Sequence, residues 1–445
     1  MFDHFFRHPF MSRTGIDALR AECVVAALCQ VELALAQAEE SEGVLTAGTA
    51  EALASALRPE AFDLEALADD VGKGGNVAIP FVKQAKAMLP ERLRSAFHHG
   101  ATSQDIVDTA LMLLLKPRLE ACLTHLAKLR RAQGELMRRH RDTPMIGRTL
   151  MQQALPITFG VKVAQWAWGM VQAERRLQRV VDTGLYVQFG GAVGVHSGLD
   201  ASGMTVMADL ARILALAEPM LPWHTDRQPV LELIGAVDAV AVAAEKTALD
   251  IALLCQSEIG ELSEPAAPGV GGSSSMPHKR NPVACARIRA AARQIHAHHG
   301  VILNAGAQPL ERGLGEWHAE WAPLLDAVIS LEGALESMVP LIEGLEVHEE
   351  AMTRNLHVSG GVVMTEPATR LLSRIMDSGR ARNLAQRASE KARQERRDYA
   401  GVLLEEPDVA GRLDVDTVHS ALAIDLYIGS SGVQVDRLLS RPDFQ

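Results

Sequence analysis

The stretch from residue 229 to residue 262 reads PVLELIGAVDAVAVAAEKTALDIALLCQSEIGEL, and it decides the fold class of this chain. Its apolar residues recur at spacings of three and four, which places them on one stripe of an α-helix. At about 1.5 Å per residue the segment forms a rod of roughly 50 Å, and such a rod needs other helices beside it. The stripe consists of Val230, Ile234, Val237, Ala241, Ala244, Ala248, Ile251 and Cys255.

The rest of the chain is helical in pattern almost throughout, and few segments alternate as strands do, so we expect an all-α fold. Further long helices are predicted at 106–140, 158–183 and 320–344, with another that starts near Pro282. The expected domains are an N-terminal helical domain at 1–105, a central helix bundle at 106–355 and a C-terminal helical domain at 356–445.

Composition narrows the class of protein. The chain has 445 residues, of which 48% are hydrophobic, so it can bury a large core. A net charge of −11 argues against nucleic acid as a partner. The five cysteines show no CxxC spacing and are expected to be reduced thiols in a cytoplasmic protein. No signal peptide and no membrane-spanning run are expected either.

Residues 272–282 read Gly-Ser-Ser-Ser-Met-Pro-His-Lys-Arg-Asn-Pro and follow a run rich in glycine and proline. Glycine and proline end a helix, so this stretch is predicted to be a surface loop. Taken by itself, it is most simply a polar linker. Its hydroxyl, imidazole, ammonium, guanidinium and amide groups also suit the capture of a polyanionic substrate, and Lys279, Arg280 and Arg312 stand out as cations in an acidic chain.

The order of these residues resembles the signature loop of the fumarase/aspartase superfamily (Gly-Ser-Ser-x-Met-Pro-x-Lys-x-Asn-Pro) at every fixed position. The resemblance implies a three-domain all-α fold whose central bundles merge into a homotetramer. It also implies active sites shared between three subunits and a reaction that needs no metal or organic cofactor. Ser273 then corresponds to the serine that transfers the proton.

A second cluster reads His-His-Gly-Ala-Thr-Ser-Gln-Asp over residues 98–105. Its simplest interpretation is a helix start capped by Thr102 or Ser103. A helix N-terminus also attracts anions, so both interpretations can hold together. The string resembles the adenylosuccinate lyase and carboxymuconate branches of the superfamily.

A third cluster, Gly-Arg-Thr-Leu-Met-Gln-Gln-Ala-Leu-Pro, covers residues 147–156. The amine-releasing branches have histidine where this chain has Leu150. One interpretation makes Leu150 an ordinary core residue. The other follows from acidity: a departing amine must be protonated, whereas a carboxylate is a weak base and needs no acid nearby. Leu150 therefore favours a reaction in which the leaving or attacking group is a carboxylate.

The carboxymuconate cycloisomerase branch also has a residue other than histidine at this place. Resemblance to it extends over nearly the whole chain, although residues 226–228 read Asp-Arg-Gln where the branch tends to have Gln-Arg-Asp. It implies lactonisation of 3-carboxy-cis,cis-muconate to 4-carboxymuconolactone through an aci-carboxylate, in the protocatechuate branch of the β-ketoadipate pathway. The implied catalytic residues are Ser273, Lys279 and His98, and the implied substrate-binding residues are Thr102, Ser103, Gln152, Ser274, Met276, Asn281 and Arg312.

Three alternatives stay open. The first is a fumarate-releasing lyase such as adenylosuccinate lyase, against which Leu150 argues. The second is a cycloisomerase for a sulfonated muconate. The third is a structural protein without activity, against which the retention of Ser273, Lys279 and Asn281 argues. His296 and His299 have helical spacing for a metal pair but no carboxylate close in sequence, so we expect them on a solvated face.

Overall fold

The computed structural model of the chain describes residues 6, 9–266, 271–272, 276 and 279–445. The chain forms two compact units, each built from three segments. The boundaries of the units fall within long helices, and the predicted division at residues 105 and 355 stays a prediction. Unit 1 comprises Met1–Ala127, Gln172–Glu245 and Ala286–Met338, and unit 2 comprises Lys128–Val171, Lys246–Cys285 and Val339–Gln445.

Five long helices confirm the predicted all-α class. Four of them match the predicted positions closely, because their apolar periodicity is unbroken and proline or glycine flanks their ends. They are α7 (Ser103–Arg139), α8 (Phe159–Thr183), α11 (Val283–Ala305) and α12 (Glu316–Glu343), and the fifth is α10 (Gln228–Leu254).

The helix α10 ends earlier than its sequence predicts. It stops at Leu254 rather than near residue 262. Gly260 then takes a left-handed conformation with φ of 59°, which turns the chain. Beyond that turn, β3 (Leu262–Ser263) pairs antiparallel with β4 (Glu346–Val347). The apolar residues after Leu254 therefore belong to a turn and a short strand.

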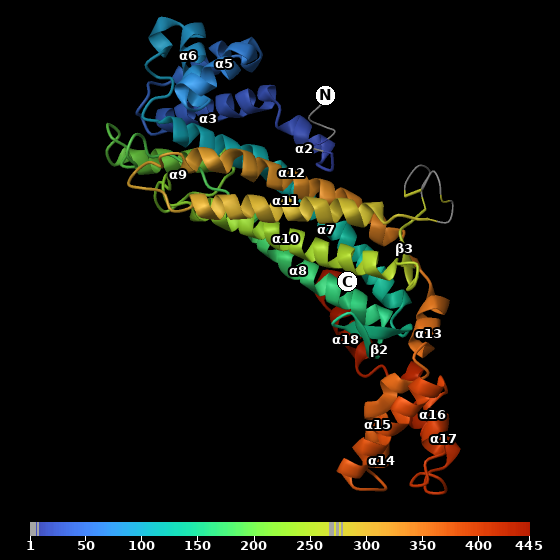
Figure 1. Ribbon diagram of the computed structural model, residues 1–445. Helices are drawn as coiled ribbons and strands as arrows, with labels where there is room; N and C mark the ends of the chain where they lie inside the picture. Colours follow the sequence, from blue (N-terminus) through green and yellow to red (C-terminus); the bar gives the residue numbers. More distant parts are fainter. Residues whose placement is uncertain (1–5, 7–8, 267–270, 273–275, 277–278) are drawn as a thin grey trace. The chain divides into compact units, whose positions relative to one another are not determined.

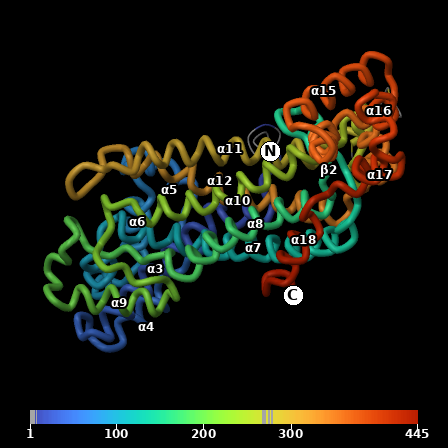
Figure 2. Tube along the Cα trace, turned by 90° about the horizontal axis from the view of Figure 1, so that it is seen from below, coloured from blue at the N-terminus to red at the C-terminus, as the bar shows by residue number. Residues whose placement is uncertain are grey.

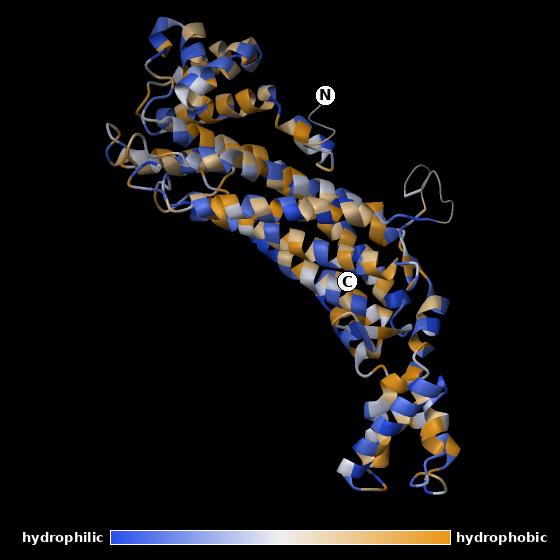
Figure 3. Cartoon of the chain, viewed as in Figure 1, coloured by the Kyte–Doolittle hydropathy of each residue, from blue (hydrophilic) through white to orange (hydrophobic). Residues whose placement is uncertain are grey.

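Within unit 1, α10 and α11 run side by side, as Figures 1 and 2 both show. The predicted stripe is buried: Ile234, Val237 and Ala244 each have no exposed surface. Blue and orange residues are interleaved around the long helices in Figure 3, as expected where a helix buries one stripe and leaves another polar.

The N-terminal part of unit 1 is a small helical cluster whose core includes Leu28, Leu53 and Phe81. The helix α3 is its centre and contacts both α4 and α9. Its members are α2 (Arg13–Ala18), α3 (Ala21–Ser41), α4 (Thr49–Ala56), α5 (Leu64–Gly74), α6 (Ala78–Met88) and α9 (Ser202–Leu214).

One helix of the described chain, α3, is long and apolar enough to cross a membrane by length and composition alone. More than half of its most apolar window is buried inside the protein, at 56%. This burial is the behaviour of a core helix in a globular fold.

A β-hairpin in unit 2 was not predicted from the sequence. The strands β1 (Pro144–Thr149) and β2 (Gln152–Thr158) pair antiparallel, with Thr149 opposite Gln152. The two residues between them, Leu150 and Met151, have φ of 49° and 65°. Such a two-residue turn with both φ values positive is usually made by asparagine and glycine, so the sequence carried no turn signal.

The C-terminal helices of unit 2 form a second core around Tyr399, whose side chain is fully buried. They are short and amphipathic, and α15 packs against both α14 and α16. The set is α13 (Glu349–His357), α14 (Thr365–Leu372), α15 (Ser378–Glu395), α16 (Tyr399–Leu404), α17 (Val415–Ala421) and α18 (Ser431–Leu439).

Candidate active site

The first group of predicted site residues lies at the start of α7 in unit 1. The Asp105 carboxylate accepts a hydrogen bond from the backbone N–H of Thr102 at 2.9 Å, which is the acidic half of a capping box. Thr102 and Ser103 are half-buried, and their hydroxyls make no hydrogen bond within the described chain. Both hydroxyls are therefore open to a ligand at the positive end of a 37-residue helix.

Asp105 ties two further segments to this helix start. Its Oδ1 lies 2.6 Å from Nε2 of His224, and its Oδ2 also accepts the backbone N–H of Gly191 at 2.9 Å. Asp105 has no exposed surface and His224 is 4% exposed. A buried carboxylate with these partners fixes the positions of the backbone around Thr102.

Arg312 lies in the same unit but is more constrained than a free substrate-binding cation. Its Nη1 donates to the side-chain oxygen of Gln104 at 2.7 Å, and its Nη2 donates to the carbonyls of Gly191 at 2.7 Å and Ala192 at 3.0 Å. Burial lowers the pKa of the Arg312 guanidinium. These contacts place a positive charge beside the segment that Asp105 holds.

Beneath this group lies a buried ion-pair network. Arg227 donates to Asp108 at 2.8 Å and to Glu320 at 2.8 Å, and all three side chains are 2% exposed. Burial raises the pKa of Glu320, although the Arg227 charge opposes the shift. Trp317 donates to Asp108 at 2.8 Å and packs edge-to-face on the partly buried Trp321 at 4.8 Å, so the two indoles serve packing.

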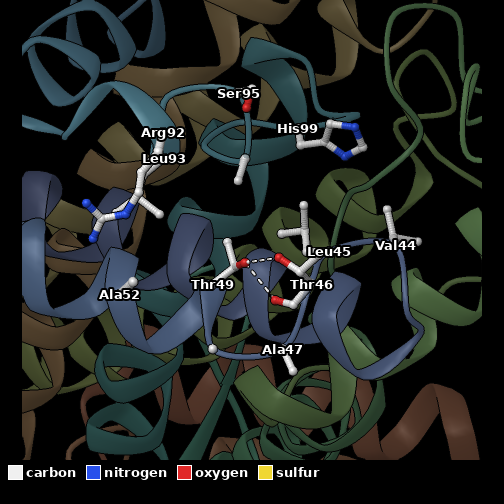
Figure 4. Close-up of a pocket in the computed structure, with 12 residues that line it drawn as sticks. Val44, Leu45, Thr46, Ala47, Thr49, Ala52, Arg92, Leu93, Ser95 and His99 are labelled. Atoms are coloured by element: carbon white, nitrogen blue, oxygen red, sulfur yellow. Dashed lines mark hydrogen bonds between the residues drawn. The ribbon is translucent and has the colours of Figure 1, made fainter.

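Two consecutive histidines connect the turn before α7 to α3. Nδ1 of His98 lies 2.6 Å from Oε1 of Glu32, and Nδ1 of His99 lies 2.8 Å from Oε1 of Glu39. Both glutamate side chains are fully buried. Burial raises the pKa of Glu39 to about 7. His99 lies at the edge of a cavity of about 490 Å³ (Figure 4), which is also lined by Thr46, Thr49, Arg92 and Ser95.

The second group of predicted site residues lies in unit 2, at the base of the signature loop. Gly272 pairs with Arg280 in an antiparallel bridge, and the Asn281 N–H donates to the carbonyl of Gly271 at 2.9 Å. A Cβ on Gly271 would lie 2.9 Å from the Asn281 carbonyl oxygen, and the residue has φ of 73°. The turn therefore requires glycine at 271.

The adjacent cations Lys279 and Arg280 lie in different environments. Arg280 donates to the two Glu346 oxygens at 2.8 Å each and to the carbonyl of Glu264 at 2.6 Å. The exposed Lys279 ammonium pairs with no residue that the structure describes. Arg280 thus anchors the loop base, whereas Lys279 keeps its charge available for an anion.

The serines Ser273 and Ser274, predicted to transfer the proton and bind substrate, lie outside the described residues. Met276 is described and is 43% exposed. Lys279 and Asn281 line a cavity of about 930 Å³ together with Cys255. Burial raises the pKa of the Cys255 thiol to about 11, so it stays a thiol at neutral pH.

Leu150 and Gln152 lie at the tip of the β1–β2 hairpin. The Leu150 side chain is 96% exposed and that of Met151 is 69% exposed, so the interpretation of Leu150 as a core residue is wrong. Gln152 is exposed as well. The hairpin projects these side chains because the two-residue turn leaves no neighbouring backbone to cover them.

Arg148, from the same motif, holds the hairpin in place. It donates to both oxygens of Glu261, at 2.9 Å and 2.6 Å. Glu261 is fully buried and also accepts from the Asn355 side chain at 2.8 Å. Such a bidentate, hydrogen-bonded pair fixes geometry strongly.

The predicted site residues that lie in unit 1 are His98, Thr102, Ser103 and Arg312. Those that lie in unit 2 are Gln152, Met276, Lys279 and Asn281. Over the described ranges, no three His, Cys, Asp or Glu side chains are grouped to hold a metal ion. His296 and His299 were expected on a solvated face; both are half-buried, and both bond to Asp238 of α10, which is distant in sequence.

This chain belongs to a family of lyases: a family described as "Lyase" matches its residues 11–297. It is 37% identical over 429 residues to a 3-carboxy-cis,cis-muconate cycloisomerase of Bradyrhizobium diazoefficiens, with 95% of each chain covered. The crystal structure of the 3-carboxy-cis,cis-muconate lactonizing enzyme of Pseudomonas putida matches with a TM-score of 0.89 and 34% identity, covering 98% of both chains. A nitrosuccinate lyase of Streptomyces davaonensis is 36% identical, covering 98% of this chain and 94% of that protein. The resemblance to carboxymuconate cycloisomerases is thereby confirmed.

Several residues that shape the site were not singled out from the sequence. They are the acids that hold its other groups: Glu32, Asp105, Glu261, Glu264 and Glu346. A signal did exist for Glu32, because it and Glu39 are seven residues apart on one face of a mainly apolar helix. Acids on a buried stripe need partners, and that requirement could have pointed to the two histidines.

Proposed function

We propose that this protein is a cycloisomerase that lactonises 3-carboxy-cis,cis-muconate. The main support is near-full-length similarity, at 36–37% identity, to several proteins named for that activity. The Lys279 ammonium, which pairs with no described residue, and the hydroxyls at the start of α7 are groups that suit a tricarboxylate substrate.

The proposed reaction is an intramolecular addition. One substrate carboxylate adds to an alkene carbon, and the neighbouring carbon, next to another carboxylate, receives a proton. The intermediate is an aci-carboxylate whose charge needs cations and N–H groups around it. Ser273 donates the proton, while Lys279 and Asn281 hold the carboxylate that takes up the charge.

The remaining carboxylates are assigned to the other predicted residues. Thr102 and Ser103 supply hydroxyls and helix N–H groups, and Arg312 supplies positive charge from a guanidinium already fixed by carbonyl groups. His98 assists at the substrate. The other substrate-binding residues in this proposal are Gln152, Ser274 and Met276, and no metal or organic cofactor takes part.

Leu150 supports a leaving group that is a weak base. Its exposed aliphatic side chain cannot protonate a departing amine, as a histidine at this position could. This argues against adenylosuccinate and other amine-releasing substrates. It does not separate a carboxymuconate from a sulfonated muconate, because both cyclise through a carboxylate.

A second candidate function is elimination from nitrosuccinate, favoured by the similarity to a nitrosuccinate lyase at 36% identity. Elimination of nitrite from nitrosuccinate also expels a weak base, so Leu150 is compatible with this reaction too. The two candidates differ in product: one retains all atoms in a lactone, whereas the other releases an inorganic ion and leaves fumarate.

The setting of the enzyme is also a proposal. We infer a cytoplasmic homotetramer in the protocatechuate pathway, whose active sites combine residues from three subunits. Membership of the lyase family supports an assembled site. The three-domain division at residues 105 and 355 belongs to the same proposal.

The test is an ultraviolet assay of diene loss with 3-carboxy-cis,cis-muconate, followed by identification of the lactone by NMR. Ser273→Ala should lower turnover by about 10² or more, because one proton-transfer group typically supplies that factor. Near-normal turnover in a purified Ser273→Ala tetramer would remove that serine from the mechanism, and no diene loss in the wild type would refute the function.

A further inference from the structure

The contact between His98 and Glu32 has a chemical consequence for the active site. The Nδ1 atom of His98 is 2.6 Å from Oε1 of Glu32, and this is the hydrogen bond that the ring makes within the described chain. The His98 side chain keeps 16% of its surface exposed, while that of Glu32 keeps none. One ring nitrogen is therefore committed to a buried acid, and Nε2 is left open.

The backbone around His98 is bent to make this contact. His98 has φ of 59° and Gly100 has φ of 64°, both in the left-handed region. Residues other than glycine adopt that region seldom, histidine more often than most, and such strain persists where the surroundings enforce it. A Cβ at Gly100 would lie 2.8 Å from Leu199, so the turn before α7 is tightly packed. The two histidines are held toward α3 at the cost of this strain.

The carboxylate decides which nitrogen of His98 can exchange a proton. A carboxylate only accepts hydrogen bonds, so we assign the hydrogen of the short contact to Nδ1. This is true of the neutral imidazole and of the imidazolium alike. Only Nε2 can then gain or lose a proton, and its tautomer is fixed before substrate arrives.

We propose that Glu32 is a positioning residue that confines the exchangeable proton of His98 to Nε2 and aims that nitrogen at the substrate. The inference rests on the proposed function, since it takes His98 as a group at the substrate. It adds to that function a residue of α3, which is 66 positions away from His98 in sequence.

A matched control exists in the same turn. Glu39 and His99 form the same type of contact at 2.8 Å, seven residues further along α3. The Glu39 side chain is fully buried, as that of Glu32 is, so both substitutions disturb the same packing. His99, however, lines the separate cavity of Figure 4 and is not assigned a role at the substrate.

The experiment is a double-mutant cycle on kcat and KM. His98→Asn keeps a donor near the position of Nδ1 and tolerates positive φ, but it removes Nε2. It should lower kcat by about 10², and Glu32→Gln should lower kcat by about tenfold or more with little change in KM. In the His98→Asn background, Glu32→Gln should have less than about a twofold further effect, because the two residues act as one unit.

Glu39→Gln should change kcat by less than about twofold in every background, and thermal unfolding should confirm that all variants fold. An equal loss from Glu32→Gln with and without His98 would overturn the proposal, as would a loss matched by Glu39→Gln. If the wild type turns over no muconate, the proposed function fails by itself. The pairing of His98 with Glu32 is then tested by ¹⁵N NMR of labelled histidine. A neutral His98 ring protonated at Nε2 instead of Nδ1 would contradict the proposal.

Discussion

At the scale of single residues, neighbouring groups of like chemistry have different roles because their partners differ. Arg280 is neutralised by Glu346, and Lys279 beside it pairs with no described residue. From the sequence, both side chains were predicted to be cations that capture an anionic substrate. Their partners could not be predicted, because Glu346 lies 66 residues away in a segment without any motif.

The first prediction concerns Lys279. Lys279→Ala should raise KM and lower kcat by about tenfold or more in each case, with unchanged thermal stability, because an exposed ammonium that pairs with no described residue contributes little to folding. Higher salt should weaken substrate capture by the wild type and less so by Lys279→Ala. Steady-state kinetics at several salt concentrations measure these effects. A KM that changes neither with the substitution nor with salt would contradict the prediction.

A second prediction concerns Glu39 and pH. Burial raises its pKa to about 7, so the folded state holds this proton more tightly than the unfolded state does. Stability from this group is therefore present below the unfolded pKa of about 4.3 and is lost as pH rises toward 7. The variant Glu39→Gln mimics the protonated acid. Between pH 5 and pH 8 its free energy of unfolding should rise relative to that of the wild type by about 1–3 kcal/mol.

Urea unfolding of both proteins at the two pH values checks this prediction. The difference in free energy of unfolding between the two proteins is compared at pH 5 and at pH 8. This removes any effect of the amide that does not depend on pH. A gap between the two proteins that is the same at pH 5 and pH 8 would show that Glu39 is ionised in the fold throughout.

At the scale of elements, long helices could be predicted and the hairpin could not. The stripe on α10 is visible in the sequence because seven apolar residues of the helix share one face. The hairpin turn is made by Leu150 and Met151, two good helix formers in a conformation that favours asparagine and glycine. Local propensity opposes this structure, and departures of this kind are expected at functional sites.

The third prediction tests that departure. Replacing Leu150 with Asn and Met151 with Gly should stabilise the chain by about 1 kcal/mol, since both residues accept positive φ. Activity should fall at the same time if the exposed apolar side chains meet the substrate in the assembled enzyme. Chemical denaturation and the diene assay measure the two effects. A stabilised variant with full activity would assign the turn no role in catalysis.

Leu150→His provides the complementary test on this element. A histidine there should bring no useful gain in cycloisomerisation, because no amine leaves. Since Leu150 is 96% exposed within the chain, the substitution should also cost little stability in the isolated subunit. A marked rise in cycloisomerase rate would show that the leaving carboxylate does benefit from an acid.

At the scale of the whole molecule, the predicted site residues are distributed over two compact units. Their identities could be predicted from motifs, whereas the acids that hold them depend on contacts across long sequence separations. The helix bundle explains this, because residues on parallel rods come together irrespective of their order in the chain.

The fourth prediction is complementation between subunits. Native mass spectrometry should give four times the 48.0 kDa of one chain. Coexpressed His98→Asn and Ser273→Ala chains should recover a measurable part of the wild-type activity, because a mixed tetramer contains sites with both native residues. Inactivity of the mixture, with mixed tetramers demonstrated, would argue that each subunit carries a complete site.

The central claim is that the protein adds a carboxylate across an alkene, and a direct comparison of substrates tests it most sharply. The values of kcat/KM for 3-carboxy-cis,cis-muconate, nitrosuccinate and adenylosuccinate should be measured on one preparation. We expect the muconate to exceed both others by at least about 10², because Leu150 occupies the position where amine-releasing relatives have histidine and the site is proposed to hold three carboxylates. A higher value for nitrosuccinate, with nitrite released, or amine release within about tenfold of the muconate rate would contradict the claim.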